Sequence, residues 1–261
     1  MNAKIKKYYQ KIKSILGLSL QLAKAGFKLR NEGSYLGILW YLLNPLLMFC
    51  LLFLIFSNRL GVEIPNYPLY LLLGIIMFNF FQQATTEATK TIIHEYRLLI
   101  KSINFPRESL IGSIVLKTLF SHLFEIILFI IFLLIFKNSL IGIISYPIIL
   151  LFFCFFAFGV SLILAALTVY FIDLENIWLF ASRLVWLGTP IFYAIEGQTR
   201  LFYINLLNPM YYFITIARDL IIYARTPELW LISGAVGYSL LFLVIGFLIF
   251  NKLKIKFAEM L

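Results

Sequence analysis

The sequence predicts an all-α integral membrane protein with six transmembrane helices. Hydrophobic residues make up 62% of the chain and charged residues only 13%, whereas soluble domains carry about a quarter charged residues. Residues 36–56 form a run of 21 residues without a charge. About 20 helical residues cross the roughly 30 Å hydrocarbon core of a bilayer. The basic residues lie in short segments between such runs, as in the loops of membrane proteins.

Further runs of this kind give six predicted spans, and an even number places both termini on one side of the membrane. One side then carries 15 Lys and Arg residues and the other carries five, including Arg59. By the positive-inside rule we expect both termini in the cytoplasm, and the +10 net charge reflects topology rather than nucleic-acid binding. The predicted spans are residues 36–56, 69–88, 110–136, 146–171, 177–195 and 230–250.

A seventh apolar segment, residues 211–223, is too short to cross a bilayer and contains Arg218 next to Asp219. Asn208-Pro209 precedes it and Thr226-Pro227 follows it, which is typical of the two ends of a short helix. We expect a re-entrant or interfacial helix at the outer face, packed in protein, between the fifth and sixth spans.

The N-terminal 34 residues predict an amphipathic helix lying in the inner membrane surface, with lysines opposite an apolar face. One interpretation is an anchor attracted to anionic lipid. The other is a platform for a cytoplasmic partner. The apolar positions include Ile5, Tyr8, Ile12, Ile15 and Leu22, and the basic ones Lys4, Lys7 and Lys11.

Motifs for catalysis are absent from the sequence. It contains no G-x-x-x-x-G-K-[ST] phosphate loop, H-E-x-x-H helix, G-x-S-x-G elbow or paired-cysteine spacing. Its two histidines, His94 and His122, fall on the cytoplasmic side or inside a span, and Cys50 and Cys154 lie in apolar runs. We expect no catalytic residue, no metal site and no cofactor bound by this chain.

Placing a charged side chain within a membrane span costs about 2.5 to 3.5 kcal/mol. Each charged residue in a predicted span therefore needs an explanation. The third span holds Lys117 and Glu125 on one helical face, with His122 beside them. They either neutralise each other near the cytoplasmic boundary or take part in a transport path. Arg183 in the fifth span either extends towards Asp173 and Glu175 or contacts an anionic headgroup.

Aromatic residues are dense in and beside the spans, and most are expected to be packing or interface residues. Sugar rings stack their C–H faces on aromatic planes, so an aromatic-lined passage would suit a saccharide. The aromatic candidates for such a passage are Tyr41, Phe81, Trp186 and Tyr193.

Five motifs occur in an order typical of one family, and together they cover most of the chain. They are G-S-Y-L-G-I-L-W-Y-L-L-N-P (33–45), L-I-K-S-I-N-F-P-R-E (99–108), Y-F-I-D-L-E-N-I (170–177), T-P-I-F-Y (189–193) and L-N-P-M-Y-Y (207–212). With the basic N-terminal segment, the sequence resembles the permease subunit of ABC-2 type exporters. Within that group it resembles the exporters of O-antigen, capsule and teichoic acid.

The resemblance implies a single transmembrane domain over residues 1–261, in the inner membrane of a bacterium. It implies a homodimer with two copies of a separate cytoplasmic ATPase, which binds ATP and Mg. The implied substrate is an undecaprenyl-diphosphate-linked glycan. Two alternatives remain: an ABC-2 exporter of another substrate (teichoic acid, capsule, drug or lipid), and a membrane enzyme acting on lipid-linked sugars. An enzyme would need clustered outer carboxylates, whereas Glu63, Glu196, Asp219 and Glu228 are scattered.

The resemblance also implies roles for individual residues. The N-terminal helix and the loop between spans two and three would contact the ATPase, and we expect variants of Pro106 or Arg107 to uncouple the subunits. The coupling residues are His94, Glu95, Arg97, Lys101, Pro106, Arg107 and Glu108. The short outer helix corresponds to the family's gate helices and places Asn208, Pro209, Tyr211, Tyr212, Arg218 and Asp219 at the exit.

Overall fold

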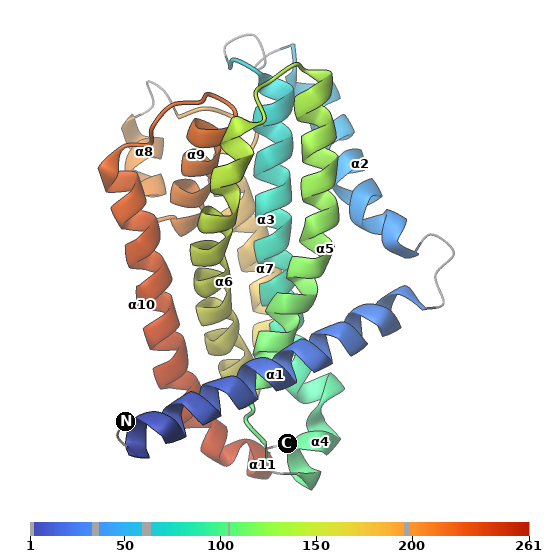
Figure 1. Ribbon diagram of the computed structural model, residues 1–261, viewed down its shortest axis with the longest axis vertical. Coiled ribbons are helices and arrows are strands. Elements are labelled where there is room, and N and C mark those ends of the chain that lie inside the picture. Colours follow the sequence, from blue (N-terminus) through green and yellow to red (C-terminus); the bar gives the residue numbers. More distant parts are fainter. Residues whose placement is uncertain (1–2, 33–36, 59–63, 104, 196–198, 261) are drawn as a thin grey trace.

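A computed structural model describes residues 3–32, 37–58, 64–103, 105–195 and 199–260. Leu36, Arg59, Glu63 and Glu196, which the sequence analysis used, lie outside these residues. Within the described ranges all regular elements are helical. The long helices run side by side in a bundle, and the first helix crosses one end of it (Figure 1).

Four helical segments are long and apolar enough to cross a membrane: 67–95, 108–135, 141–168 and 229–256. They contain α3 (Tyr67–Lys90), α5 (Glu108–Ile135), α6 (Tyr146–Thr168, after the short turn η3, Ile141–Ser145) and α10 (Leu229–Leu253). These agree with four of the predicted spans within a few residues. The predicted first span corresponds to a shorter apolar helix, α2 (Trp40–Phe56), which follows the turn η1 (Gly37–Leu39).

The predicted fifth span, 177–195, is wrong in its bounds. The helix there, α7, runs from Leu174 to Gly188. Pro190 ends it, because proline has no backbone N–H and disfavours a helical conformation in the residue before it. Thr189 is accordingly extended, with φ −84° and ψ 136°. The segment that follows, up to Ile195, is irregular and folds against the bundle.

Helix α1 (Ala3–Asn31) lies across the base of the bundle, chiefly against α5 (Figure 1). The Ser19 hydroxyl donates to the backbone oxygen of Ser109 over 3.1 Å at this contact. Leu16 and Leu20 on the same helix remain exposed. The predicted N-terminal helix is therefore present, and part of its apolar surface is left for lipid or for a partner.

The short outer helix is also present, as α9 (Pro209–Ile221). The Asn208 side chain caps it by accepting a hydrogen bond from the backbone nitrogen of Met210 over 3.1 Å, and Pro209 fills its first position. Nine of its residues are buried, so it packs within the protein as expected. A further short helix, α8 (Thr199–Leu206), precedes it and was not predicted.

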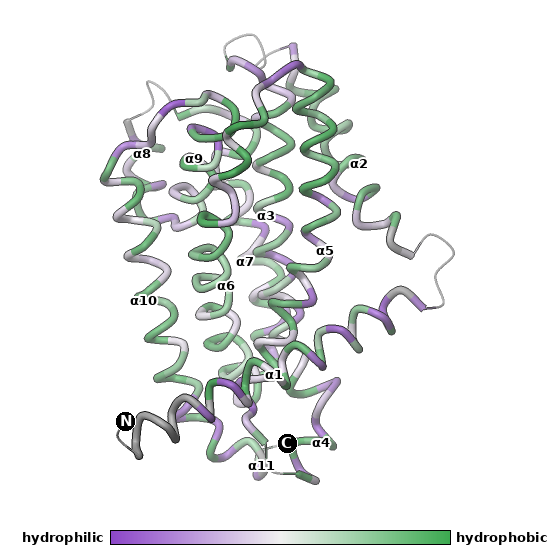
Figure 2. Tube along the Cα trace, viewed as in Figure 1, coloured by the Kyte–Doolittle hydropathy of each residue, from purple (hydrophilic) through white to green (hydrophobic). Residues whose placement is uncertain are grey.

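The base of the bundle, which is the end that α1 crosses, contains short helical elements that follow α3 and α10. Helix α3 continues through the π-helical turn η2 (Thr91–Glu95) into α4 (Arg97–Ser102). Helix α10 continues through η4 (Lys254–Lys256) into α11 (Phe257–Met260). Both ends of the chain lie at this base, opposite α8 and α9 (Figure 1). Figure 2 shows hydrophobic residues along the long helices and hydrophilic ones gathered at their ends.

Two glycines allow α6 and α10 to approach closely. A Cβ atom on Gly159 would overlap the backbone of Phe242, and one on Gly246 would meet the backbone of Gly159. Small residues at helix contacts are a common device in membrane proteins, because dispersion rather than burial from water drives the packing. This contact fixes α10 to the core of the bundle.

Candidate functional site

The end of the bundle that holds both termini presents an exposed surface of mixed character. We call it the coupling surface and define it by His94, Glu95, Arg97, Leu98 and Lys101. All five side chains are exposed, and Leu98 is 80% exposed. Leu99 and Ile103 are exposed in the same short stretch, and exposed apolar side chains that gather in a patch are a feature of interaction sites. The sequence analysis selected the charged members and missed Leu98, because an apolar residue in a short turn gives no periodic signal.

Two other predicted coupling residues, Arg107 and Glu108, face the chain's own C-terminal segment instead. Arg107 donates to the backbone oxygen of Lys254 and lies 5.8 Å from the ring centroid of Phe257. Glu108 forms an ion pair with Lys254. The carbonyl of Pro106 accepts from the first turn of α5. Arg107 and Glu108 thereby hold the segment that follows α10 against the start of α5.

Glu175, one of the two carboxylates towards which Arg183 could extend, pairs with other residues instead. Glu175, at the start of α7, pairs with Lys90 (3.1 Å) and with His94 (3.2 Å). Arg183 is exposed and makes no ion pair with any residue in the described ranges. Its expected extension towards Asp173 and Glu175 is therefore wrong. Arg183 lies eight residues after Glu175, about 12 Å further along the helix axis, and that carboxylate is already paired with Lys90 and His94.

Lys117 has a different partner from the one expected. Its Nζ lies 2.6 Å from Oε2 of Glu87 on α3, and Nη1 of Arg30 lies 3.1 Å from Oε1 of the same carboxylate. The predicted Lys117–Glu125 pair is wrong, because a neighbouring helix offers Lys117 a nearer carboxylate. Sequence reasoning missed Glu87, although it is the one charged residue of the predicted second span. Glu87 joins α1, α3 and α5.

Glu125 belongs to a buried chain of polar side chains within the bundle. His122 Nδ1 lies 2.8 Å from the Glu125 carboxylate, and His122 Nε2 lies 2.7 Å from the Tyr146 hydroxyl on α6. All three residues are buried. Burying a carboxylate is tolerated here because His122 is its hydrogen-bonding partner.

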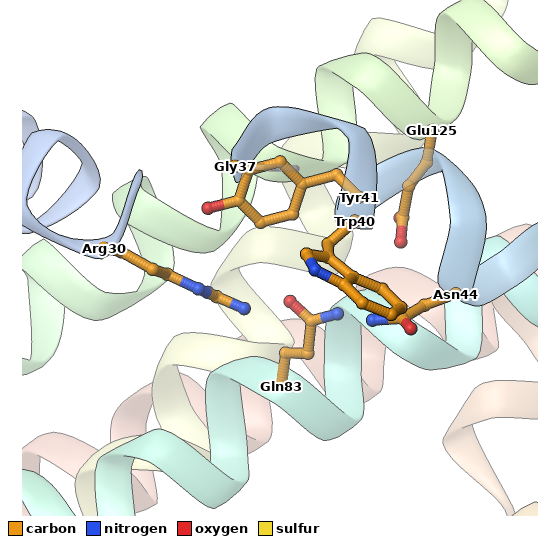
Figure 3. A pocket seen from close by; sticks show the side chains of 7 residues that line it. All are labelled: Arg30, Gly37, Trp40, Tyr41, Asn44, Gln83 and Glu125. Atoms are coloured by element: carbon orange, nitrogen blue, oxygen red, sulfur yellow. The ribbon is translucent and has the colours of Figure 1, made fainter. Parts of the chain in front are cut away.

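Glu125 and Tyr41, both predicted to line a transport path, meet at one pocket of about 110 Å³ (Figure 3). The pocket lies between the end of α1, the start of α2, and the flanks of α3 and α5. The Tyr41 hydroxyl is buried and has no hydrogen-bond partner within the described ranges. The Arg30 guanidinium lies 5.1 Å from the centroid of the Tyr41 ring. The lining residues are Arg30, Gly37, Trp40, Tyr41, Asn44, Gln83 and Glu125.

The other aromatic candidates occupy different places. Phe81 is 3% exposed and packs on Phe156 and Trp178 in the core. Trp186 contacts the ring of Phe192. Tyr193 donates to the backbone oxygen of Gly188 over 2.9 Å and thereby closes the irregular segment back onto the end of α7. None of these three lines the pocket of Figure 3.

Three of the predicted gate residues, Tyr211, Arg218 and Asp219, line a larger cleft of about 890 Å³ at the end of the bundle opposite both termini. Asn208, Pro209 and Tyr212 are not among its lining residues. Arg218 is buried at its floor, and Asp219 pairs with Arg225 over 2.6 Å. Asn208 donates to the Thr189 hydroxyl over 2.8 Å, so the cap of α9 also holds the turn after α7. Tyr211 and Trp230 line the cleft with nearly parallel rings.

These features define a class of protein. A bundle of helices long and apolar enough to cross a membrane, with polar side chains around an internal pocket and exposed charged residues at the end that holds both termini, is typical of a polytopic membrane permease.

The chain belongs to the ABC-2 type transporter family, whose model matches residues 19–222. It is 32% identical over 250 residues to an O-antigen export system permease protein RfbA of Klebsiella pneumoniae, covering 95% of this chain and 96% of that protein. A Myxococcus xanthus protein of the same name is 26% identical over 93% of this chain and 95% of its own length. The chain is thus the transport subunit of an ABC exporter, not an enzyme, and this membership implies an ATPase partner.

Proposed function

We propose that this protein is the permease of an exporter that moves a lipid-linked, O-antigen-like polysaccharide from the cytoplasmic to the outer side of a bacterial inner membrane. The observation that carries the proposal is the similarity, along 95% of the chain, to O-antigen export permeases at 32% and 31% identity. Undecaprenyl diphosphate is the proposed lipid carrier. Both termini and the coupling surface then face the cytoplasm, in keeping with the excess of Lys and Arg there.

The proposed assembly is a homodimer with two ATPase subunits. The exposed surface of α7 supports a contact with a second protein chain or with water rather than with lipid. Arg183 is exposed on this helix, as are Phe180, Leu184 and Leu187. A charge with no ion-pair partner in the described residues is costly against lipid. In this assembly α2 and α7 complete six crossings, and α8 with α9 form a re-entrant gate.

The ion pairs at the base supply a route by which ATPase movement could reach the membrane part. A push on α1 moves Arg30 and, through Glu87, both α3 and α5. A push on η2 moves His94 and, through Glu175, the start of α7. Each carboxylate contacts two side chains from different elements, so the elements move together.

The experiment that tests this function is affinity purification of the tagged chain from its native membrane in mild detergent. Mass spectrometry identifies co-purifying proteins, and an ATPase assay with vanadate follows. A stoichiometric nucleotide-binding subunit with vanadate-sensitive hydrolysis supports the exporter. A lone, ATP-inert chain, under conditions that preserve other ABC complexes, contradicts it.

The substrate is tested in cells that lack the chain. Intact polymer accumulating inside the cell, with none at the surface, supports polysaccharide export. Normal surface polymer overturns the polysaccharide assignment and returns attention to the alternative substrates, a drug or a lipid. Normal ATPase assembly and export in Pro106→Ala and Arg107→Ala variants would count against a contact there.

A further inference from the structure

We propose that the pocket of Figure 3 binds a single sugar ring of the exported glycan. This inference rests on the proposed function and goes beyond it by assigning a binding subsite. The pocket is a separate cavity from the outer cleft, and the two share no lining residue. Its volume of about 110 Å³ compares with roughly 10 to 15 Å³ for one water, so it admits a group of ring size.

The lining chemistry matches a polyol better than an anion. Arg30, with the amide groups of Asn44 and Gln83, supplies hydrogen-bond donors, whereas the Glu125 carboxylate supplies acceptors. A phosphate offers only acceptors and would be repelled by the Glu125 oxygens. Sugar hydroxyls both donate and accept. In Figure 3 the polar groups extend towards the indole of Trp40, which is 43% exposed and presents an aromatic plane to a ring's C–H face.

The buried hydroxyl of Tyr41 is an independent indication of a ligand. Tyr41 is 6% exposed and lines the pocket, yet its hydroxyl has no hydrogen-bond partner among the residues that the structure describes. Buried hydroxyls are nearly always paired, because leaving one unpaired forfeits its solvation. A hydroxyl group of a ligand in the pocket would provide the missing partner.

The pocket also shares a residue with the ion pairs that we propose transmit movement of the ATPase. Arg30 lines it at the end of α1 and shares the Glu87 carboxylate with Lys117. Movement of α1 would therefore move one wall of the pocket relative to α3 and α5. A ring held there would be bound or released according to the position of α1.

The test uses the complex of this chain and its ATPase in lipid nanodiscs. Asn44→Cys, in a Cys50→Ser background, places a thiol at the pocket, and its labelling rate by a maleimide is measured on this chain. Two probes are compared: the cell's own polysaccharide, released from its lipid by mild acid, and undecaprenyl diphosphate alone. Leu47→Cys, exposed on the same helix and outside the pocket lining, is the control.

We expect the released polysaccharide to slow labelling at position 44 and not at position 47. Tyr41→Phe should raise roughly tenfold the polysaccharide concentration that halves the labelling rate at position 44, which is the usual effect of one lost hydrogen bond to a buried group. It should leave the thermal midpoint unchanged or higher, since this hydroxyl has no partner in the protein alone. Tyr203→Phe replaces an exposed side chain on α8 and should change neither that concentration nor the thermal midpoint.

Protection by undecaprenyl diphosphate without protection by polysaccharide would overturn the sugar assignment in favour of a headgroup site. No protection by either probe would overturn the pocket as a subsite. A Tyr41→Phe variant that loses thermal stability along with protection would show that its role is structural. ATPase stimulation by the intact lipid-linked polysaccharide, measured in parallel, tests the proposed function separately.

Discussion

The guanidinium of Arg218 lies 3.2 Å from the ring centroid of Tyr70, and its Nη2 donates to the backbone oxygen of the same tyrosine over 3.0 Å. Its Nε donates to that same oxygen over 3.3 Å, and the other bonds go to the backbone oxygens of Pro190 (2.7 Å) and Ile191 (2.9 Å). One buried side chain thus fixes α9 to α3 and to the irregular segment after α7. A residue selected from sequence as part of an exit holds three parts of the outer end together.

Replacement of Arg218 by lysine should lower the thermal midpoint of the detergent-solubilised protein. A lysine ammonium lacks the planar fork and cannot reach all three carbonyl oxygens. Each buried carbonyl left unpaired costs about 1 to 3 kcal/mol. Thermal unfolding followed by size-exclusion detection measures the change. The matched control is Arg225→Lys, whose side chain is 63% exposed; equal shifts in the two variants would refute the clamp.

Glu87→Gln should also destabilise the protein, because it leaves Arg30 and Lys117 without their shared carboxylate. Removing one partner of a partly buried ion pair costs more than the pair itself contributes. The double variant with Lys117→Met should recover part of the loss, and the coupling is read from the double-mutant cycle. Glu32→Gln, which removes an exposed pair with Lys28, is the control. Additive effects of the two substitutions would contradict direct pairing.

Gly159→Ala should separate α6 from α10. Its Cβ would overlap the backbone of Phe242, which cannot turn aside as a side chain can. Overpacking of this kind costs about 1 to 3 kcal/mol. Gly237→Ala on α10, where no atom lies within 4 Å of the added Cβ, should be neutral or slightly stabilising. The difference in thermal midpoint between the two variants is the measurement, and no difference would disprove the close contact.

Leu98→Asp should weaken association with the ATPase subunit by roughly tenfold or more, since the variant would place an unpaired carboxylate in the interface and take it out of water. The amount of ATPase recovered with the tagged chain measures this. Leu229→Asp is the control, because Leu229 is comparably exposed at the start of α10, at the opposite end of the bundle. Undiminished recovery with Leu98→Asp would place the docking surface elsewhere.

Several elements could be predicted from the sequence because they follow from local properties. Apolar runs gave the positions of α3, α5, α6 and α10, and the Asn208-Pro209 pair marked the start of α9. Helix α8 was missed because a short helix of mixed polarity has no periodic signature. The fifth predicted span was too long because hydropathy does not register the helix-ending effect of Pro190.

The pairing of charged side chains depended on tertiary structure. One sequence interpretation paired Lys117 with Glu125 from their shared helical face, and another extended Arg183 towards Asp173 and Glu175. Packing between helices instead gave Lys117 to Glu87, and Glu175 to Lys90 and His94. A sequence reports which residues share a face of their own helix, but not which face of another helix lies opposite.

The sequence by itself determined the class of the protein, because the length and apolarity of a helix that crosses a bilayer are local quantities that each segment carries alone. Only the tertiary structure decided that Tyr41 and Glu125, 84 positions apart in the sequence, line one pocket. It also decided that Arg218 donates to the backbone oxygens of three residues from two other parts of the chain. Those relationships arise from the rotation and depth of each helix against its neighbours, and these are set by the packing of the whole bundle.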